Sequence, residues 1–247
     1  MKISFVIPAY NEESCLAQCL NSISRELKKT KCDAEIVVVD NGSTDKTAEI
    51  AHSFPGVKLV YEPKKGISSA RHAGYLAASG DLIANVDADT KLTPGWIGKV
   101  QKYFSKDPKL IALSGPFVYH DISAPVRSLI RGYYILVFGV HLLNHRVLGL
   151  SSVLQGGNYI IKKSALDKVR GYNPEYEFWG EDADIARRLH PHGKVKFALR
   201  LPIYSSGRRL AAEGILKTGG KYVANYFWVV FFKKPLMKKT RHIRTGR

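Results

Sequence analysis

The stretch Leu82-Ile83-Ala84-Asn85-Val86-Asp87-Ala88-Asp89 joins a short apolar run to two carboxylates. An apolar run of this length, bounded by polar residues, predicts a buried strand. Residues i and i+2 leave a strand on the same side, so Asp87 and Asp89 present their oxygens close together. Paired carboxylate oxygens suit a hard divalent cation. An acidic turn after a buried strand is the alternative, because Asp is favoured in turns.

The first half of the chain alternates apolar strand patterns with helical patterns. Strands are expected at 3–7, 35–40, 57–61 and 82–86, and helices at 12–29, 46–54 and 66–78. Strands that alternate with helices at this spacing predict a parallel, doubly wound α/β sheet.

Polar groups follow three of these strands where each one ends. They are Pro8-Ala9-Tyr10-Asn11, Asp40-Asn41-Gly42-Ser43 and Asp87-Ala88-Asp89. Ligands of such sheets bind outside the carboxyl ends of the strands. The three groups are therefore expected to converge on one site.

The second half is less regular, with a helix expected at 92–104 and Pro94 in its first turn. A strand is expected at 110–118, an aromatic and Leu-rich insertion at 120–152, a strand at 158–161, a helix at 181–189 and a strand at 194–199. No composition break precedes about residue 207. The expected organisation is a domain at 1–206, with a nucleotide-binding half at 1–91 and an acceptor and catalytic half at 92–206, followed by a basic aromatic tail at 207–247.

The charge of the chain is high and uneven. The 247 residues carry a net charge of +17, which predicts an anionic partner. Residues 207–247 hold eleven Lys and Arg against the single acid Glu213, a net +10. Three cysteines without zinc spacing, no signal-peptide pattern and no long apolar span indicate a cytoplasmic location.

Several motifs, taken in order, resemble one enzyme family. They are Phe5–Glu12, Val39–Asp45, Ala70–Gly74 with the run to Asp89, Gly157-Asn158, Gly171-Tyr172 and Glu181–Asp184. The pattern resembles a family 2 glycosyltransferase of the GT-A fold over roughly residues 3–200. The resemblance implies sugar transfer from a nucleotide-sugar donor, with inversion at the anomeric carbon.

The resemblance also implies a donor site. Its residues are Pro8, Ala9, Tyr10, Asn11, Glu12, Asp40, Asn41, Arg71, Asp87, Ala88 and Asp89. Within it, Pro8, Tyr10 and Asp40 line the nucleobase and ribose pocket, and Arg71 lies near the donor diphosphate. Asn41 replaces the acid that commonly follows Asp40, so uracil is the first expectation and guanine and thymine stay open.

A cofactor follows from the same resemblance. Asp89 contacts Mg²⁺ or Mn²⁺ directly, and Asp87 lies nearer the ribose and the metal shell. Many relatives carry a further His ligand where this chain reads Pro202-Ile203-Tyr204-Ser205-Ser206. His190 and His192 are more typical of surface residues. Metal affinity is therefore expected to be weak without the donor.

Asp182 is expected to be the catalytic base, with Glu181 orienting the site. The resemblance matches Asp182 to the family's Glu-Asp motif at the start of a helix, where anions are favoured. A simple helix cap is the alternative. Gly157, Asn158 and Trp179 are candidate acceptor residues, and Trp179 is equally compatible with a core position.

The tail combines aromatic sequence with dense positive charge. The eleven residues 222–232 form a helix of about 16 Å, too short to cross a bilayer. With the lysines and arginines that follow, they predict an interfacial anchor on an anionic membrane. Packing on the domain is the alternative. Arg208 and Arg209 are expected to close over the donor diphosphate.

Together these features predict a metal-dependent inverting glycosyltransferase on the cytoplasmic membrane face, acting in cell-envelope or lipid-linked glycan synthesis. The expected donor is a nucleotide-diphosphate sugar, with a UDP-sugar first. The acceptor is a hydroxyl or phosphate of a saccharide or polyprenyl-linked molecule. The alternative is a nucleotide-sugar-binding protein without efficient turnover. No nucleic-acid partner is expected, because no recognisable reader motif accompanies the charge.

Overall fold

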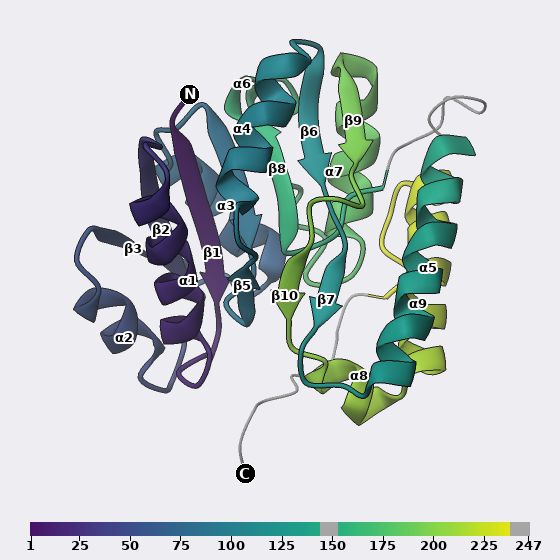
Figure 1. The fold of residues 1–247 in the computed structure, drawn as a ribbon, viewed down its shortest axis with the longest axis horizontal. Helices are drawn as coiled ribbons and strands as arrows, with labels where there is room; N and C mark the ends of the chain where they lie inside the picture. The colour runs from purple at the N-terminus through teal and green to yellow at the C-terminus, as the bar shows by residue number, and fades with distance from the viewer. Residues whose placement is uncertain (144–152, 238–247) are drawn as a thin grey trace.

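A seven-stranded sheet forms the centre of the molecule (Figure 1). The computed structural model describes residues 1–143 and 153–237. The sheet order is β3-β2-β1-β4-β8-β6-β9. Its strands are β1 (Ile3–Ala9), β2 (Ala34–Asp40), β3 (Val57–Tyr61), β4 (Leu82–Val86), β6 (Leu110–Ser114), β8 (Asn158–Lys162) and β9 (Lys194–Phe197). Among these strands β8 alone runs antiparallel to its neighbours, which confirms the mostly parallel α/β sheet.

A second, three-stranded sheet lies at the lower ends of β8 and β6 in Figure 1. Its order is β5 (Thr90–Leu92), β10 (Ile203–Ser205) and β7 (Phe117–Tyr119). Strand β10 runs antiparallel to β5 and parallel to β7. Since β5 starts directly after Asp89, the small sheet fixes the direction in which the acidic pair leaves β4.

Helices cover both faces of the large sheet (Figure 1). One face packs against α1 (Leu16–Lys29), α2 (Thr47–Ser53) and α4 (Trp96–Lys106). The other packs against α3 (Ile67–Ala77), α6 (Lys163–Lys168) and α7 (Glu181–Leu189). A short 3-10 helix at His190–His192 follows α7.

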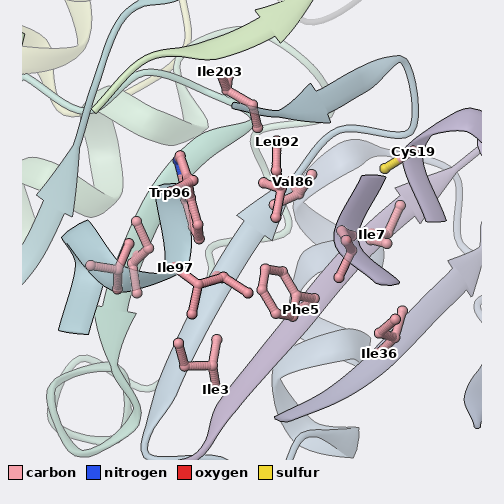
Figure 2. Close-up of a cluster of buried hydrophobic side chains, with 14 of the residues drawn as sticks. Ile3, Phe5, Ile7, Cys19, Ile36, Val86, Leu92, Trp96, Ile97 and Ile203 are labelled. Carbon is pink, nitrogen blue, oxygen red and sulfur yellow. The ribbon is translucent and has the colours of Figure 1, made fainter. Parts of the chain in front are cut away.

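The core between α1, α4 and the sheet is apolar and fully buried. In Figure 2 the side chain of Phe5 lies close to Ile97, with Trp96 and Val86 nearby. The ring centres of Phe5 and Trp96 lie 6.1 Å apart. Burying an aromatic or branched aliphatic side chain contributes about 1.5–3 kcal/mol. This core therefore holds the carboxyl ends of β1 and β4 in fixed positions beside each other.

Three further helices lie beyond the β9 edge and at the lower end in Figure 1: α5 (Ala124–Leu143), α8 (Arg208–Glu213) and α9 (Ile215–Phe232). Val229 of α9 is fully buried and packs in one cluster with Tyr176 and with Ala183 of α7. Within the part of the chain that the structure describes, no helix is both long and apolar enough to span a membrane. The division into a domain at 1–206 and a tail at 207–247 stays a prediction.

Several expected boundaries are wrong. Leu92 belongs to β5, and the next helix begins only at Trp96 because Gly95 takes a left-handed conformation (φ 74°). The helix expected from residue 12 begins at Leu16. The strand expected to reach residue 199 ends at Phe197, and the tail helix starts earlier than expected, at Ile215.

The strand expected at 110–118 is divided between the two sheets, as β6 and β7. Pro116 lacks the N–H that a central strand needs. A Cβ on Gly115 would lie 1.9 Å from the Leu201 carbonyl oxygen, so only glycine fits at the break. Of the 120–152 insertion, residues 144–152 lie outside the described residues, as do the basic residues of the tail from Lys238 onward.

Candidate active site

One cavity of about 570 Å³ opens at the carboxyl ends of β1, β2 and β4. The convergence expected from the parallel topology is therefore present. Of the predicted site residues, those lining the cavity are Pro8, Ala9, Tyr10, Asn11, Glu12, Asn41, Asp87, Ala88, Asp89, Arg208 and Arg209. Arg208 and Arg209 line the cavity from the start of α8, almost 200 residues after the first strand.

Hydrogen bonds between two loops fix the end of β1. Asn11 has a left-handed backbone (φ 55°), which Asn tolerates better than most residues. Its N–H donates to Ser43 Oγ, and its Oδ1 accepts the Thr44 N–H at 2.8 Å. Asp40 is buried, and its Oδ1 accepts the Ser43 N–H at 3.0 Å. Asp40 therefore supports the wall without being one of the residues that line the cavity, and its contact with a nucleobase stays a prediction.

Asn41 lines the same cavity as Tyr10. Its Nδ2 donates to the carbonyls of Glu62 and Lys64, both at 2.8 Å, and its Oδ1 accepts the Gly66 N–H at 2.9 Å. Only an amide, which both donates and accepts, can make all three of these bonds, whereas a carboxylate could not donate to the two carbonyls. Asn41 thus holds the loop that leads into α3.

Lys65 lines the cavity and was missed by sequence analysis. Its Nζ lies 3.8 Å from the centre of the Tyr10 ring and donates to the carbonyls of Asn41 and Gly42. A cation over an aromatic face is attracted by the ring quadrupole. Lys65 belongs to an irregular loop, so no periodic signal in the sequence points to it.

Arg71 joins the end of β4 to the start of α7. Its side chain is 2% exposed, and Nη2 donates to Asp87 Oδ1 at 2.8 Å while Nη1 pairs with Glu181 Oε1. The Arg71 guanidinium carbon also lies 5.2 Å from the centre of the Tyr159 ring. Arg71 is not one of the residues that line the cavity, so it acts on the site by orienting two carboxylates. Its expected contact with a diphosphate stays a prediction.

A glycine pair lies between Asp87 and Asp182. A Cβ on Gly157, whose φ is 77°, would lie 2.2 Å from Asp87 Oδ2. The Gly156 N–H donates to Asp182 Oδ2 at 3.1 Å, and the Ala183 N–H donates to Oδ1 at 2.8 Å. Burial raises the pKa of Asp182, opposed by the Ala183 N–H and by the charge of Arg71. A carboxylate with a raised pKa is a better proton acceptor, as a general base requires.

Asp89 and Glu12 share one cationic partner. Arg208 Nη2 lies 2.6 Å from Glu12 Oε1 and 3.1 Å from Asp89 Oδ2. Burial raises the pKa of Asp89 to about 7; the Arg208 charge opposes this, and the charges of Asp87 and Glu12 add to it. Burial likewise raises the pKa of Glu12. The site therefore places several carboxylates close together, and a bound cation would stabilise their charged forms.

The donor set fits a hard divalent cation. Carboxylate oxygens of Asp89 and Glu12 converge on a single positive nitrogen, and Glu12 Oε2 is buried without a hydrogen-bond partner among the described residues. Those residues contain no group of three or more His, Cys, Asp or Glu arranged to hold a metal. An ion bound at Asp89 would therefore complete its oxygen shell from a substrate's phosphates, as Mg²⁺ commonly does.

The candidate acceptor residues Asn158 and Trp179 are both buried, but they contact different neighbours. Asn158 is fully buried, and its amide bonds the Pro116 and Leu201 carbonyls and accepts from Trp96 Nε1. Trp179 is buried, and its ring centre lies 5.1 Å from that of Tyr222. Its neighbour Phe178 lines the cavity instead. Sequence analysis also missed Phe117, Tyr119, Glu177, Thr218 and Tyr222, which complete the wall. They come from β7, the loop before α7 and α9, and no motif marks them.

A family model described as "Glycosyl transferase family 2" matches residues 4–170. The chain belongs to this family. A second family model, "N-terminal domain of galactosyltransferase", matches residues 148–204. The two matches together cover β1 to the start of β10, which includes the acidic pair and Asp182.

Curated relatives match this family 2 chain over part of their length. It is 29% identical over 194 residues to the poly-beta-1,6-N-acetyl-D-glucosamine synthase of Staphylococcus epidermidis, covering 76% of this chain and 45% of that protein. It is 34% identical over 155 residues to the dolichyl-phosphate beta-glucosyltransferase ALG5D of Trichomonas vaginalis, covering 57% of this chain and 47% of that protein. The chain thus spans less than half the length of these relatives.

Solved structures share the fold. The mannosyltransferase PcManGT of Pyrobaculum calidifontis, in complex with GDP-Man and Mn²⁺, superposes with a TM-score of 0.71 at 20% identity, covering 94% of this chain and 63% of that one. The TarS 1–349 structure from S. aureus superposes with a TM-score of 0.66 at 20% identity, covering 94% of this chain and 72% of that one. The expected GT-A fold is confirmed.

Proposed function

We propose that this protein transfers a sugar from a nucleotide-diphosphate sugar to an acceptor, with inversion at the anomeric carbon. The observation that carries the proposal is the cavity at the strand ends, which brings Tyr10, Asp89 and Arg208 together. An aromatic wall, a carboxylate and a guanidinium are the groups that a base, a metal-bound diphosphate and its free oxygens require.

The donor is proposed to lie along the strand ends. The base and ribose contact Pro8, Ala9, Tyr10 and Asn11, with Asp40 and Asn41 behind them. TarS has been solved with UDP-GlcNAc and PcManGT with GDP-Man, so relatives of this fold accept different bases. A UDP-sugar is the first expectation here. Arg208 and Arg209 face the diphosphate from α8, and guanidinium forks match phosphate oxygens.

Asp89, with Asp87 behind it, is proposed to hold Mg²⁺ or Mn²⁺. Such an ion supplies Lewis-acid charge neutralisation on the leaving diphosphate. Asp182 takes the proton from the acceptor hydroxyl, since a single displacement needs a base on the face opposite the leaving group. Arg71 holds Asp87 and Glu181, and through them the distance between the leaving-group side and the base side of the site.

A nucleotide-sugar panel tests this function. Wild-type protein is incubated with UDP-, GDP- and dTDP-sugars, Mn²⁺ and candidate saccharide or polyprenyl-phosphate acceptors, while released nucleoside diphosphate and donor binding are measured. Acceptor-dependent release with at least one donor supports the proposal. Donor binding without release from any acceptor favours the alternative, a nucleotide-sugar-binding protein without efficient turnover.

The acceptor is proposed to be presented at an anionic membrane. Thr218 and Tyr222 of α9 line the cavity, while the opposite side of the same helix exposes Val223, Phe227 and Phe231. On α5, Leu129, Ile135 and Leu136 are each more than 60% exposed. Neither helix contains an acid, and α9 runs into Lys233 and Lys234. Apolar aromatic surface beside positive charge suits the interface of an anionic leaflet on the cytoplasmic side.

Removing the exposed phenylalanines of α9 should weaken membrane binding. We expect the double variant Phe227→Ser/Phe231→Ser to partition into phosphatidylglycerol vesicles at least tenfold less than wild type, because burial of each ring is worth about 1.5–3 kcal/mol. Vesicle sedimentation measures this. Tyr61→Ser is the control, since Tyr61 is 67% exposed on the opposite edge strand. Equal binding of wild type to anionic and neutral vesicles would contradict membrane docking.

A further inference from the structure

Arg208 uses a single nitrogen to satisfy two carboxylates of the proposed metal site. Its Nη2 lies 2.6 Å from Glu12 Oε1 and 3.1 Å from Asp89 Oδ2. All three side chains are less than a fifth exposed. Two carboxylate oxygens thus converge on one positively charged nitrogen at ion-pair distances, and a divalent cation bound here would draw on the same two carboxylates.

The surrounding charge explains why this position requires a cation. Burial is the main cause of the raised pKa values of Asp89 and Glu12; Arg208 opposes the shift, and the charge of neighbouring Asp87 adds to it at both groups. The second oxygen of Glu12 is buried and has no hydrogen-bond partner among the described residues. One guanidinium therefore balances only part of the negative charge gathered here.

We propose that Arg208 is an internal counter-ion, which occupies the cation position between Asp89 and Glu12 and must leave it before a divalent metal binds. The inference rests on the proposed metal site at Asp89. A metal ion and a guanidinium nitrogen compete for the same carboxylate oxygens. Phosphate oxygens offer Arg208 an alternative partner within the same cavity, and they match its fork of donors.

This competition makes metal and donor binding cooperative. Without a diphosphate, the metal binds only the fraction of molecules in which Arg208 has left, so its apparent affinity falls by that fraction. With a diphosphate present, Arg208 transfers to the phosphate and releases both carboxylates. By linkage the two ligands strengthen each other equally.

Hydrogen bonds from Ser206 and Gly207 to Asp121 fix the chain just before Arg208. Gly207 donates its N–H to Asp121 Oδ1 at 2.6 Å, and Ser206 Oγ donates to Asp121 Oδ2 at 2.7 Å. Helix α8 is only six residues long and ends at Glu213, before Gly214, whose φ is 85°. Arg208 itself lines the cavity, so a change of its side-chain rotamer toward a bound phosphate would not require these backbone contacts to break.

The experiment is a titration of Mn²⁺ into the protein without nucleotide, followed by the electron paramagnetic resonance signal of free Mn²⁺. We expect Arg208→Gln to bind Mn²⁺ roughly tenfold more tightly than wild type, since the competing cation is gone. Lys217→Gln is the matched control, because Lys217 is an exposed cation on the neighbouring α9. The Mn²⁺ affinity of this variant should equal that of wild type. Adding UDP should tighten Mn²⁺ binding in wild type far more than in Arg208→Gln.

Arg208→Lys keeps the charge and provides a second, less disruptive variant. Its Mn²⁺ affinity should stay nearer to wild type than to Arg208→Gln. Mn²⁺ affinity in Arg208→Gln that equals or falls below that of wild type overturns the counter-ion. The nucleotide-sugar panel on wild type reports separately on the proposed function: a protein that transfers no sugar but shows the Mn²⁺ shift overturns that function and supports the counter-ion.

Discussion

Asp182→Asn should reduce sugar transfer by roughly a thousandfold or more while donor affinity stays near that of wild type. Asparagine has nearly the same shape and still accepts one of the two N–H bonds from Gly156 and Ala183. It cannot take a proton from the acceptor hydroxyl. The measurements are acceptor-dependent release of nucleoside diphosphate and donor binding by calorimetry.

Asp184→Asn is the matched control for this prediction. Asp184 lies on the same helix and is paired with Arg187 and Arg188, whereas Asp182 accepts backbone N–H bonds from Gly156 and Ala183; neither side chain is among the residues that line the cavity. Loss of the same charge there should leave turnover largely intact. Because burial raises the pKa of Asp182, wild-type turnover should fall on acidification at a higher pH than an ordinary Asp would give. Full activity of Asp182→Asn would remove Asp182 from the mechanism.

Arg71→Met should lower the free energy of unfolding by about 3 kcal/mol. The guanidinium is 2% exposed and pairs with both Asp87 and Glu181. Its removal leaves Glu181 buried without its charge partner, whereas Asp87, one-third exposed, is partly rescued by water. Urea unfolding measures the loss. The expected effect lies at the lower end of the range for broken buried pairs because of that exposure.

Arg25→Met provides the comparison, since Arg25 is exposed on α1 and surface substitutions usually change stability by less than about 0.5 kcal/mol. Arg71→Lys retains the charge and should recover part of the lost stability, although Lys lacks the fork that reaches two carboxylates. If Arg71→Met unfolds at the same urea concentration as Arg25→Met, the bridge between β4 and α7 does not stabilise the fold.

Local patterns predicted the elements that are apolar runs with clear polar ends. The strands at 57–61 and 82–86 and the helix at 181–189 agree with the structure at both ends. The strand expected at 110–118 is divided because Gly115 meets the Leu201 carbonyl. That contact joins residues 86 positions apart, and no local pattern contains it.

The candidate site was predictable to the extent that sheet topology determines it. Parallel strands place Tyr10, Asn41 and Asp89 at one edge, and all three line the cavity. The contacts that tune the site depend on loops. Lys65 over Tyr10 and the bridge from Arg208 to Glu12 join residues far apart in the chain, without a periodic or spacing signal.

The location of a bound nucleoside diphosphate and its metal tests the central claim most directly. Crystals grown with Mn²⁺ and the nucleoside diphosphate favoured in the panel would be measured at the manganese absorption edge. We expect an anomalous peak within about 2.5 Å of an Asp89 carboxylate oxygen, with the base against Tyr10 and the diphosphate facing Arg208. A nucleotide bound outside this cavity, or a manganese peak away from Asp89, would contradict the account.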